Sequence, residues 1–186
     1  DALTATPFTA AIDSPILLTG KDNLDSKTKA ELQRLGTKKV YLIGGEDSLS
    51  KNVQTQLSNM GISVERISGS DRYKTSISLA QKLNSIKSVS QVAVANGVNG
   101  LADAISVGAA AADNNMPIIL TNEKSELQGA DEFLNSSKIT KSYIIGGTAT
   151  LSSNLESKLS NPTRLAGSNR NETNAKIIDK FYPSSD

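Results

Sequence analysis

Residues 143–147 read Tyr-Ile-Ile-Gly-Gly, and residues 41–45 carry the same pattern as Tyr-Leu-Ile-Gly-Gly. Residues 117–121 (Pro-Ile-Ile-Leu-Thr) likewise repeat residues 15–19 (Pro-Ile-Leu-Leu-Thr), and both pairs are 102 positions apart. Short runs that are apolar throughout and end in glycine or polar residues are typical of strands buried on both faces. These stretches therefore predict an α/β fold with a parallel sheet, built from a unit that occurs twice.

A third motif extends the repeat and shows where the copies differ in length. Residues 66–72 (Arg-Ile-Ser-Gly-Ser-Asp-Arg) match residues 164–170 (Arg-Leu-Ala-Gly-Ser-Asn-Arg) at an offset of 98, so the second copy is four residues shorter. A period of about 100 residues is too long for a solenoid and indicates tandem domains. We expect the C-terminal part of a first module at residues 1–68, a complete second module at 69–166 and the start of a third at 167–186. Because the repeat begins and stops inside a unit, the native protein is expected to continue past both ends.

Apolar spacing in the second module predicts helices and strands in strict alternation, which places helices on both faces of the sheet. The expected helices are residues 71–83, 101–113, 125–135 and 152–159, and the expected strands are residues 91–96, 116–121, 142–145 and 163–166. Ser70 or Asp71 is expected to cap the first helix and Ser152 the last, because a short polar side chain can accept hydrogen bonds from the free N–H groups of the first turn.

The composition limits the chemistry. The chain has 186 residues, 37% hydrophobic and 21% charged, which is typical of a globular protein. Its 20 Lys and Arg nearly balance 19 Asp and Glu, which argues against nucleic-acid binding through bulk positive charge. No run approaches the roughly 20 apolar residues of a membrane span. The absence of His and Cys excludes a Ser-His-Asp triad, a Cys-His pair and any His or Cys metal site, so we expect no enzyme, metal or cofactor.

The ordered motifs together resemble the clostridial cell-wall-binding repeat 2 family, found in S-layer and other surface proteins of clostridia and related Gram-positive bacteria. The resemblance runs from Asp1 to about Lys180. It implies three tandem Rossmann-like or Toprim-like α/β modules around a pseudo-threefold axis. It also implies a secreted protein, anchored noncovalently to the wall or S-layer surface through an anionic secondary polymer such as a teichoic-acid-like polysaccharide. The segments that the resemblance links to anchoring are Pro15, Ile16, Leu17 and Leu18, and Pro117, Ile118, Ile119 and Leu120.

Side-chain chemistry and position in the fold indicate candidate polymer-binding residues. The planar guanidinium of arginine can form paired hydrogen bonds with phosphate. Ligands of open α/β sheets bind beyond the carboxyl ends of the strands, where the loop after each Pro-Ile motif should lie. The candidates are Arg66, Arg72, Arg164, Arg170, Lys21, Thr19, Thr121 and Asn122. The apolar Pro-Ile strands themselves are expected to support the site from the core.

Each of these motifs also has a structural interpretation. The glycine pairs that end the Tyr-x-Ile-Gly-Gly motifs either cradle a phosphate or form tight turns with positive φ, and the turn is favoured. Arg72 and Arg170 either contact the ligand or pair with Asp1 or Asp103, and those carboxylates are otherwise expected to cap the helices that follow them.

We therefore expect a noncatalytic wall-anchoring chain in which several weak, similar sites hold one repeating polymer and avidity provides retention. The alternative is a structural module of a surface layer, which packs against sister modules of the same chain and has no glycan site. A nucleotide-binding protein is disfavoured, because neither glycine pair belongs to a full Gly-x-Gly-x-x-Gly fingerprint.

Overall fold

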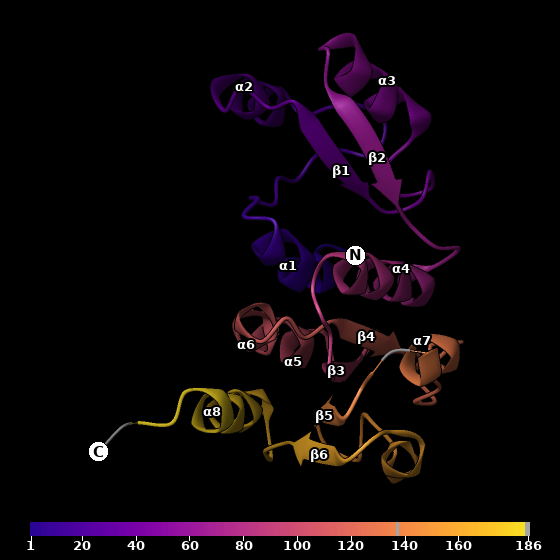
Figure 1. The fold of residues 1–186 in the computed structure, drawn as a ribbon, viewed down its shortest axis with the longest axis vertical. Coiled ribbons are helices and arrows are strands. Elements are labelled where there is room, and N and C mark those ends of the chain that lie inside the picture. Colours follow the sequence, from indigo (N-terminus) through magenta and orange to yellow (C-terminus); the bar gives the residue numbers. More distant parts are fainter. Residues whose placement is uncertain (137, 185–186) are drawn as a thin grey trace.

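The computed structural model describes residues 1–136 and 138–184. One part of the chain contains α1 (Ala2–Ala11), α2 (Ser26–Arg34), β1 (Lys39–Ile43), α3 (Lys51–Asn59) and β2 (Ser63–Ile67). The other contains α4 (Arg72–Ile86), β3 (Gln91–Asn96), α5 (Leu101–Ser106), α6 (Gly108–Asp113), β4 (Ile118–Thr121), α7 (Asp131–Ser136), β5 (Lys141–Ile145), the 3₁₀ helix η1 (Ser153–Lys158), β6 (Pro162–Leu165) and α8 (Arg170–Phe181). We call these parts the first and second blocks. They stack along the long axis of the molecule, with α1 and α4 between the two sheets (Figure 1).

Both sheets are parallel, as the sequence predicts. In the second block the strand order is β4-β3-β5-β6, and in the first block β1 pairs with β2. Successive residues of a strand point to opposite faces. Val92 and Val94 of β3 therefore pack on the face covered by α4, α7 and η1, while Ala93 and Ala95 meet α5, α6 and α8 on the other face. The small side chains let the alanine-rich helices α5 and α6 approach the sheet closely.

The blocks are joined mainly through helices. α1 packs against α6 and α4, and α4 also packs against β4. The helix α4 contributes side chains to two hydrophobic cores. Its Leu79 packs with residues of the first block, which are Ala5, Phe8 and Ile67. Its Ile77 and Leu83 belong to the core of the second block. By the repeat offset of 98, α8 corresponds to α4 and packs on α5 and α6 in the same manner. The interface between modules is thus built from elements of the repeat itself.

Several predicted boundaries agree with the structure. The first expected helix is α4, and Asp71 caps it by accepting a hydrogen bond from the Lys74 N–H at 2.8 Å. Ser152 caps η1 through the Asn154 N–H. The expected strands correspond to β3, β4, β5 and β6, although β4 begins at Ile118 rather than at residue 116.

Three predicted helices were wrong in extent or type. The helix expected over residues 101–113 is interrupted at Val107, next to Gly108, and forms α5 and α6. The helix expected over 125–135 begins only at Asp131, because Ser125, Gln128 and Gly129 have φ values of +60°, +51° and +84°, which no right-handed helix contains. The helix expected over 152–159 is the 3₁₀ helix η1.

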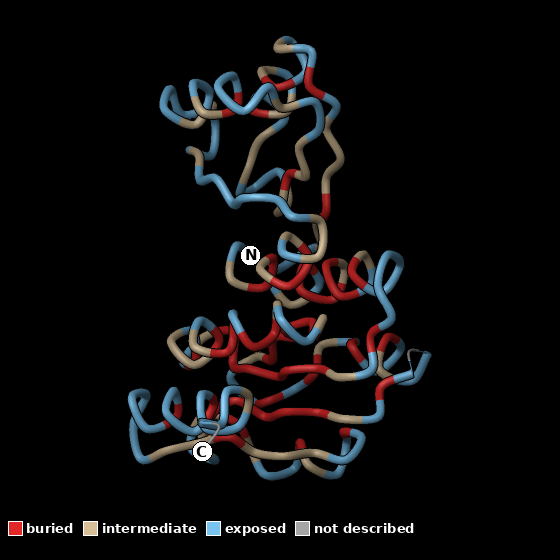
Figure 2. The backbone as a smooth tube through the Cα atoms, turned by 60° about the vertical axis from the view of Figure 1, so that its left-hand side comes forward, coloured by how far each residue is buried: buried red, intermediate tan, exposed pale blue. Residues whose placement is uncertain are grey.

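The two copies of the Pro-Ile segment differ in structure. Residues 118–121 form the buried strand β4, as predicted, and Pro117 before it is also buried. Residues 15–18, which match them in sequence, form no strand and are exposed. Figure 2 shows the same contrast, since buried residues are concentrated in the sheet of the second block and are sparse in the first.

Candidate functional site

Two arginines hold the loops beyond the carboxyl ends of the sheets. Arg66 on β2 donates through Nη1 to the Gly44 carbonyl oxygen at 2.7 Å, and Arg164 on β6 donates to the Gly146 carbonyl oxygen at 2.9 Å. Arg164 also pairs with Glu156, with Nη2 and Oε1 2.7 Å apart. Both arginines were candidates for polymer binding, yet their guanidinium groups form hydrogen bonds within the protein. Their position organises the glycine loop in each module.

The glycine pairs form turns, as the structural interpretation predicted. Gly44 and Gly146 have φ values of +122° and +126°, a region that disfavours any residue with a Cβ atom. A Cβ at Gly44 would lie 3.0 Å from Oδ2 of Asp1, and one at Gly146 would lie 3.1 Å from Oδ2 of Asp103. A carboxylate therefore packs against the turn at the same place in both modules.

Neither carboxylate forms the capping hydrogen bond or the close ion pair expected of it, although Asp1 does occupy the N-cap position of α1. Asp103 lies within the first turn of α5, whose N-cap is Gly100, and Asp1 stands at the N-cap of α1 without a capping hydrogen bond. Among the described residues, neither forms an ion pair with an arginine within 4 Å, and the Oδ1 atom of each is buried without a hydrogen-bond partner. Burial raises the pKa of Asp103, and the charge of Arg170 partly offsets that rise.

A cavity of about 800 Å³ opens where the two blocks meet. Its walls come from the start of α1, the loops that follow β1 and β2, and Leu101 and Leu120 of the second block. Arg72, the first residue of α4, lines it and donates through Nη1 to the Gly97 carbonyl oxygen at 2.8 Å. The arginine thus links the loop after β2 to the loop after β3 while it lines the cavity.

The charges around this cavity are mixed. The lining contains one arginine, Arg72, and four acidic residues, which are Asp1, Glu46, Asp47 and Asp71. By the repeat offsets, the positions of the last three are taken in the second copy by Thr148, Ala149 and Asn169. The second copy, around Asp103 and Arg170, therefore carries fewer negative charges than the first.

Four other candidates lie outside the cavity lining: Thr121 is the last residue of β4, and the other three, Asn122, Thr19 and Lys21, lie in loops. Thr121 is fully buried, and Asn122 accepts hydrogen bonds from the N–H groups of Lys124 and Glu126. Thr19 accepts one from the Asp25 N–H at 2.7 Å. Lys21 is exposed, and its side chain has no hydrogen bond or ion pair to any described residue.

Asn96 was not among the predicted site residues, yet it organises this edge of the second sheet. Its side chain is 1% exposed; Nδ2 donates to the carbonyl oxygens of Thr150 and Asn122, while Oδ1 accepts from the N–H groups of Val98 and Asn99. An asparagine that ends an apolar strand and precedes a glycine was the available signal, because such a residue commonly bonds the backbone of the following turn.

The comparison with protein families decides the identity of the chain. Residues 1–54 and 66–156 match the family model described as cell wall binding domain 2 (CWB2). The chain belongs to the CWB2 family. The two matched segments end at equivalent positions of the repeat, 54 and 156, so the family match follows the two copies found in the sequence.

Three proteins similar to this chain are longer than it. N-acetylmuramoyl-L-alanine amidase LytC of Bacillus subtilis (strain 168) is 36% identical over 181 residues, covering 97% of this chain and 36% of LytC. The structures of Cwp6 and Cwp8 from Clostridium difficile are each 38% identical, with TM-scores of 0.91 and 0.85, and each covers 98% of this chain. The chain spans 30% of Cwp6 and 31% of Cwp8, so it corresponds to about a third of each relative.

These relatives support a wall-anchoring role for the CWB2 chain and confirm the family expected from its motifs. They suggest a noncatalytic module of a cell-wall-associated surface protein, although LytC carries the matching region within a protein named as an amidase. Among residues 1–136 and 138–184, no cluster of three or more acidic side chains could hold a metal ion. No helix in the same residues has the length and apolarity that crossing a membrane requires.

Proposed function

We propose that this CWB2 chain anchors a secreted surface protein noncovalently to the Gram-positive cell wall by binding an anionic secondary wall polymer where modules meet. The observation that carries this proposal is the cavity of about 800 Å³ between the blocks, which is open at the carboxyl ends of β1 and β2 and is lined by Arg72. Carboxyl ends of parallel strands are the usual ligand-binding edge of open α/β sheets.

The charges suggest how such a polymer would be held. Arg72 provides the donors for a phosphate or carboxylate of the polymer. Glu46, Asp47 and Asp71 would repel that group, so it is confined to the Arg72 end, while their oxygens can accept hydrogen bonds from sugar hydroxyls. Because these carboxylates oppose the attraction of the single arginine, one site by itself binds weakly.

Retention then depends on repetition. Arg170 begins α8 as Arg72 begins α4, and it would serve a second site of the same kind beside Asp103. Two weak sites on one polymer raise the overall affinity through their effective concentration. In this proposal residues 1–68, 69–166 and 167–186 belong to three successive modules, and sister modules pack through helices equivalent to α1, α4 and α6.

Cosedimentation with purified walls tests the proposal. The full chain is mixed with walls before and after acid extraction of their anionic polymer, and the salt concentration is varied. We expect pelleting that is lost with the polymer and weakened by salt, since screening weakens exposed charge pairs. Arg72→Gln should weaken pelleting, whereas Arg34→Gln, a change at an exposed arginine of α2 remote from the cavity, should not.

The alternative is a structural module of a surface layer. It is supported by the apolar residues that α8 leaves exposed, Ile178 at 44% among them, since the corresponding face of α4 is covered by the second sheet. Equal pelleting with extracted and intact walls, or none with either, would favour this alternative over polymer binding.

A further inference from the structure

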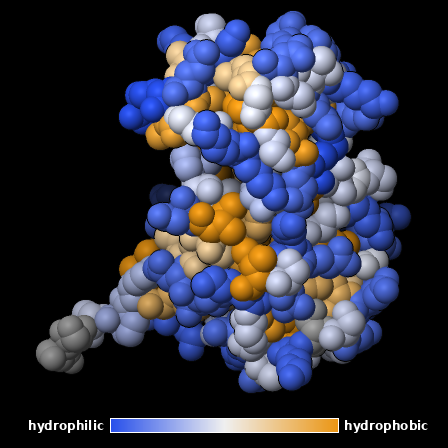
Figure 3. All heavy atoms as spheres, turned by 45° about the horizontal axis from the view of Figure 1, so that its top comes forward, coloured by the Kyte–Doolittle hydropathy of each residue, from blue (hydrophilic) through white to orange (hydrophobic). Residues whose placement is uncertain are grey.

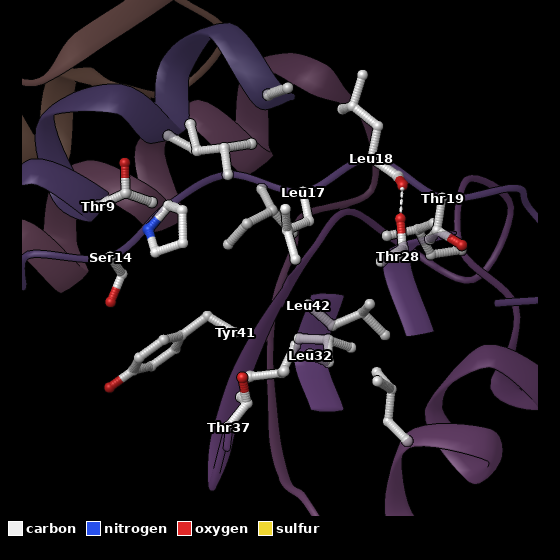
Figure 4. A pocket seen from close by; sticks show the side chains of 18 of the residues that line it. Thr9, Ser14, Leu17, Leu18, Thr19, Thr28, Leu32, Thr37, Tyr41 and Leu42 are labelled. Atoms are coloured by element: carbon white, nitrogen blue, oxygen red, sulfur yellow. Dashed lines mark hydrogen bonds between the residues drawn. The ribbon is translucent and has the colours of Figure 1, made fainter. Parts of the chain in front are cut away.

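The first block contains a carboxylate that two lysines hold. Glu65 on β2 accepts hydrogen bonds from Lys39 of β1 at 2.7 Å and from Lys82 of α4 at 2.5 Å. The Lys39 amine also lies 4.4 Å from the centre of the Tyr41 ring, and Tyr41 extends from β1 beside a cavity of about 590 Å³ (Figure 4). The hydrogen bonds from Lys39 and Lys82 lower the pKa of Glu65, so its carboxylate stays charged in this cluster.

The second block keeps three of these four residue types. At the repeat offsets of 102 and 98, the counterparts of the two lysines and the tyrosine are Lys141, Lys180 and Tyr143. The fourth position differs, because Thr163 stands where the first block has Glu65. The second block thus keeps both positive charges and the aromatic ring, without the carboxylate between them.

The strands place these counterparts alike. Glu65 lies beside Tyr41 in the register of β1 and β2. Thr163 lies beside Tyr143 in the register of β5 and β6. Nζ of Lys141 lies 5.5 Å from the centre of the Tyr143 ring and donates to Oγ1 of Thr163 at 2.6 Å. Lys141 therefore reaches the position of the carboxylate, where it finds a hydroxyl group instead.

The helix α8 brings the second lysine to the same sheet face. Ile177 packs in the core beneath α8, as its counterpart Leu79 of α4 packs in the core of the first block. Phe181 packs edge-to-face on the tyrosine ring of β5, with ring centres 4.9 Å apart. Lys180 follows Ile177 by three residues, which places the two on neighbouring parts of one helix surface. Its exposed side chain corresponds to that of the lysine of α4.

The positive charges of the second block have no internal partner. In residues 1–136 and 138–184, neither Lys141 nor Lys180 forms an ion pair. Hydrophilic side chains occupy much of the face shown in Figure 3, so an exposed lysine by itself indicates no site. What distinguishes this pair is that the same framework holds a carboxylate in the other block. There the two lysines and the glutamate are 29–45% exposed with the following block in place, so this position is open to solvent.

We propose that Lys141, Lys180 and Thr163 bind one compact anionic group, a carboxylate or a phosphate, in the place that the Glu65 carboxylate fills in the first block. Two ammonium groups donate charge-assisted hydrogen bonds, and the threonine hydroxyl can donate another. The site lies at the amino ends of β5 and β6, whereas the cavity of the proposed function lies at the carboxyl ends of the first sheet. The two sites are therefore separate.

An NMR titration of the full chain tests this site. Inorganic phosphate or acetate is added at constant ionic strength, because screening alone also shifts the signals of charged side chains. We expect saturable shifts in the signals of Lys141, Lys180 and Thr163. The signals of Lys39 and Lys82 should show none, because an internal carboxylate already fills their site. Absence of saturable shifts with both anions would overturn the proposal.

Reciprocal variants exchange the character of the two blocks. Thr163→Glu supplies an internal carboxylate and should abolish the saturable response of Lys141. Glu65→Thr removes the carboxylate and should create such a response at Lys39. The amide spectrum of each variant reports whether the chain is folded. Lys158→Gln, at an exposed lysine of η1, should leave the response unchanged. A response that persists in Thr163→Glu would contradict the proposal.

The same titration with acid-extracted wall polymer identifies the source of the anionic group. Saturation at a lower concentration of anionic groups than with phosphate assigns the group to the polymer, whereas saturation by phosphate alone assigns it to a free anion. Arg72→Gln should leave the shifts at Lys141 unchanged in either case. Failure of wall pelleting and failure of this site are therefore observed separately.

Discussion

Nη1 of Arg164 lies 2.9 Å from the Gly146 carbonyl oxygen, and Arg66 makes the same contact with Gly44 at 2.7 Å. In each module the side chain reaches from the last strand to the end of the preceding one and fixes the loop that borders the candidate site. Arg66 and Arg164, which the sequence suggested for phosphate binding, therefore stabilise these loops. The proposed ligand contacts shift to Arg72 and Arg170, at the starts of α4 and α8.

Arg164→Ala should destabilise the second block by about 1–3 kcal/mol, because hydrogen bonds from a charged group to a carbonyl and a carboxylate are lost in a half-buried place. Denaturant unfolding followed by circular dichroism measures the change in the free energy of unfolding. Arg34→Ala is the control, since its ion pair with Glu31 is exposed and contributes roughly 0–1 kcal/mol. Equal effects of the two changes would contradict the assigned role.

Gly146→Ala should be strongly unfavourable, whereas Gly147→Ala should be nearly neutral. Gly146 has φ of +126°, and a Cβ there would crowd Asp103 and Thr150, so we expect a loss of about 1–3 kcal/mol. A Cβ at Gly147 meets no atom within 4 Å. Thermal unfolding of the two variants measures the difference. If both variants melted like the unmodified chain, the strained turn would not be required.

Asp103 should make stability depend on pH in a defined direction. Burial raises its pKa above the ordinary value of 3.8, so the folded chain holds this proton more tightly than the unfolded chain does. Its contribution to stability is therefore greatest at acid pH and is lost as the pH rises through the folded pKa. Asp103→Asn should flatten the curve of unfolding free energy against pH above about pH 4, whereas Asp131→Asn, at an exposed carboxylate on α7, should not. An unchanged slope in Asp103→Asn would contradict this assignment.

The two Pro-Ile segments should respond differently to truncation. Ile119→Ala removes a fully buried side chain and should destabilise the second block by about 2–5 kcal/mol. Leu17→Ala affects a partly exposed side chain and should cost about 1 kcal/mol or less. Unfolding free energies test this comparison. A wall-retention defect in Ile119→Ala is then expected to follow the loss of folded protein rather than the loss of a polymer contact, and a fully folded Ile119→Ala chain that fails to pellet would contradict that view.

Much of the fold was predictable because its signals are local. Apolar runs such as residues 117–121 and 142–145 correspond to β4 and β5, and the glycines at 44 and 146 occupy positive-φ turns. Asp71 caps α4 as its residue type indicated. The segment before α7 was mispredicted, because its apolar spacing resembles a helix while the positive φ of Ser125 and Gln128 depends on the loop being packed against its surroundings.

The sequence by itself determined the parallel α/β unit, its repetition and the family, since periodicity, turn residues and motif order are properties of the chain alone. Only the tertiary structure decided what the arginines contact, why the Oδ1 atom of Asp103 is buried without a hydrogen-bond partner, and which copy of the Pro-Ile segment is covered. Those features depend on residues distant in the chain: the same four residues are buried beside β3 and exposed where no strand lies next to them, because burial is a property of the neighbours.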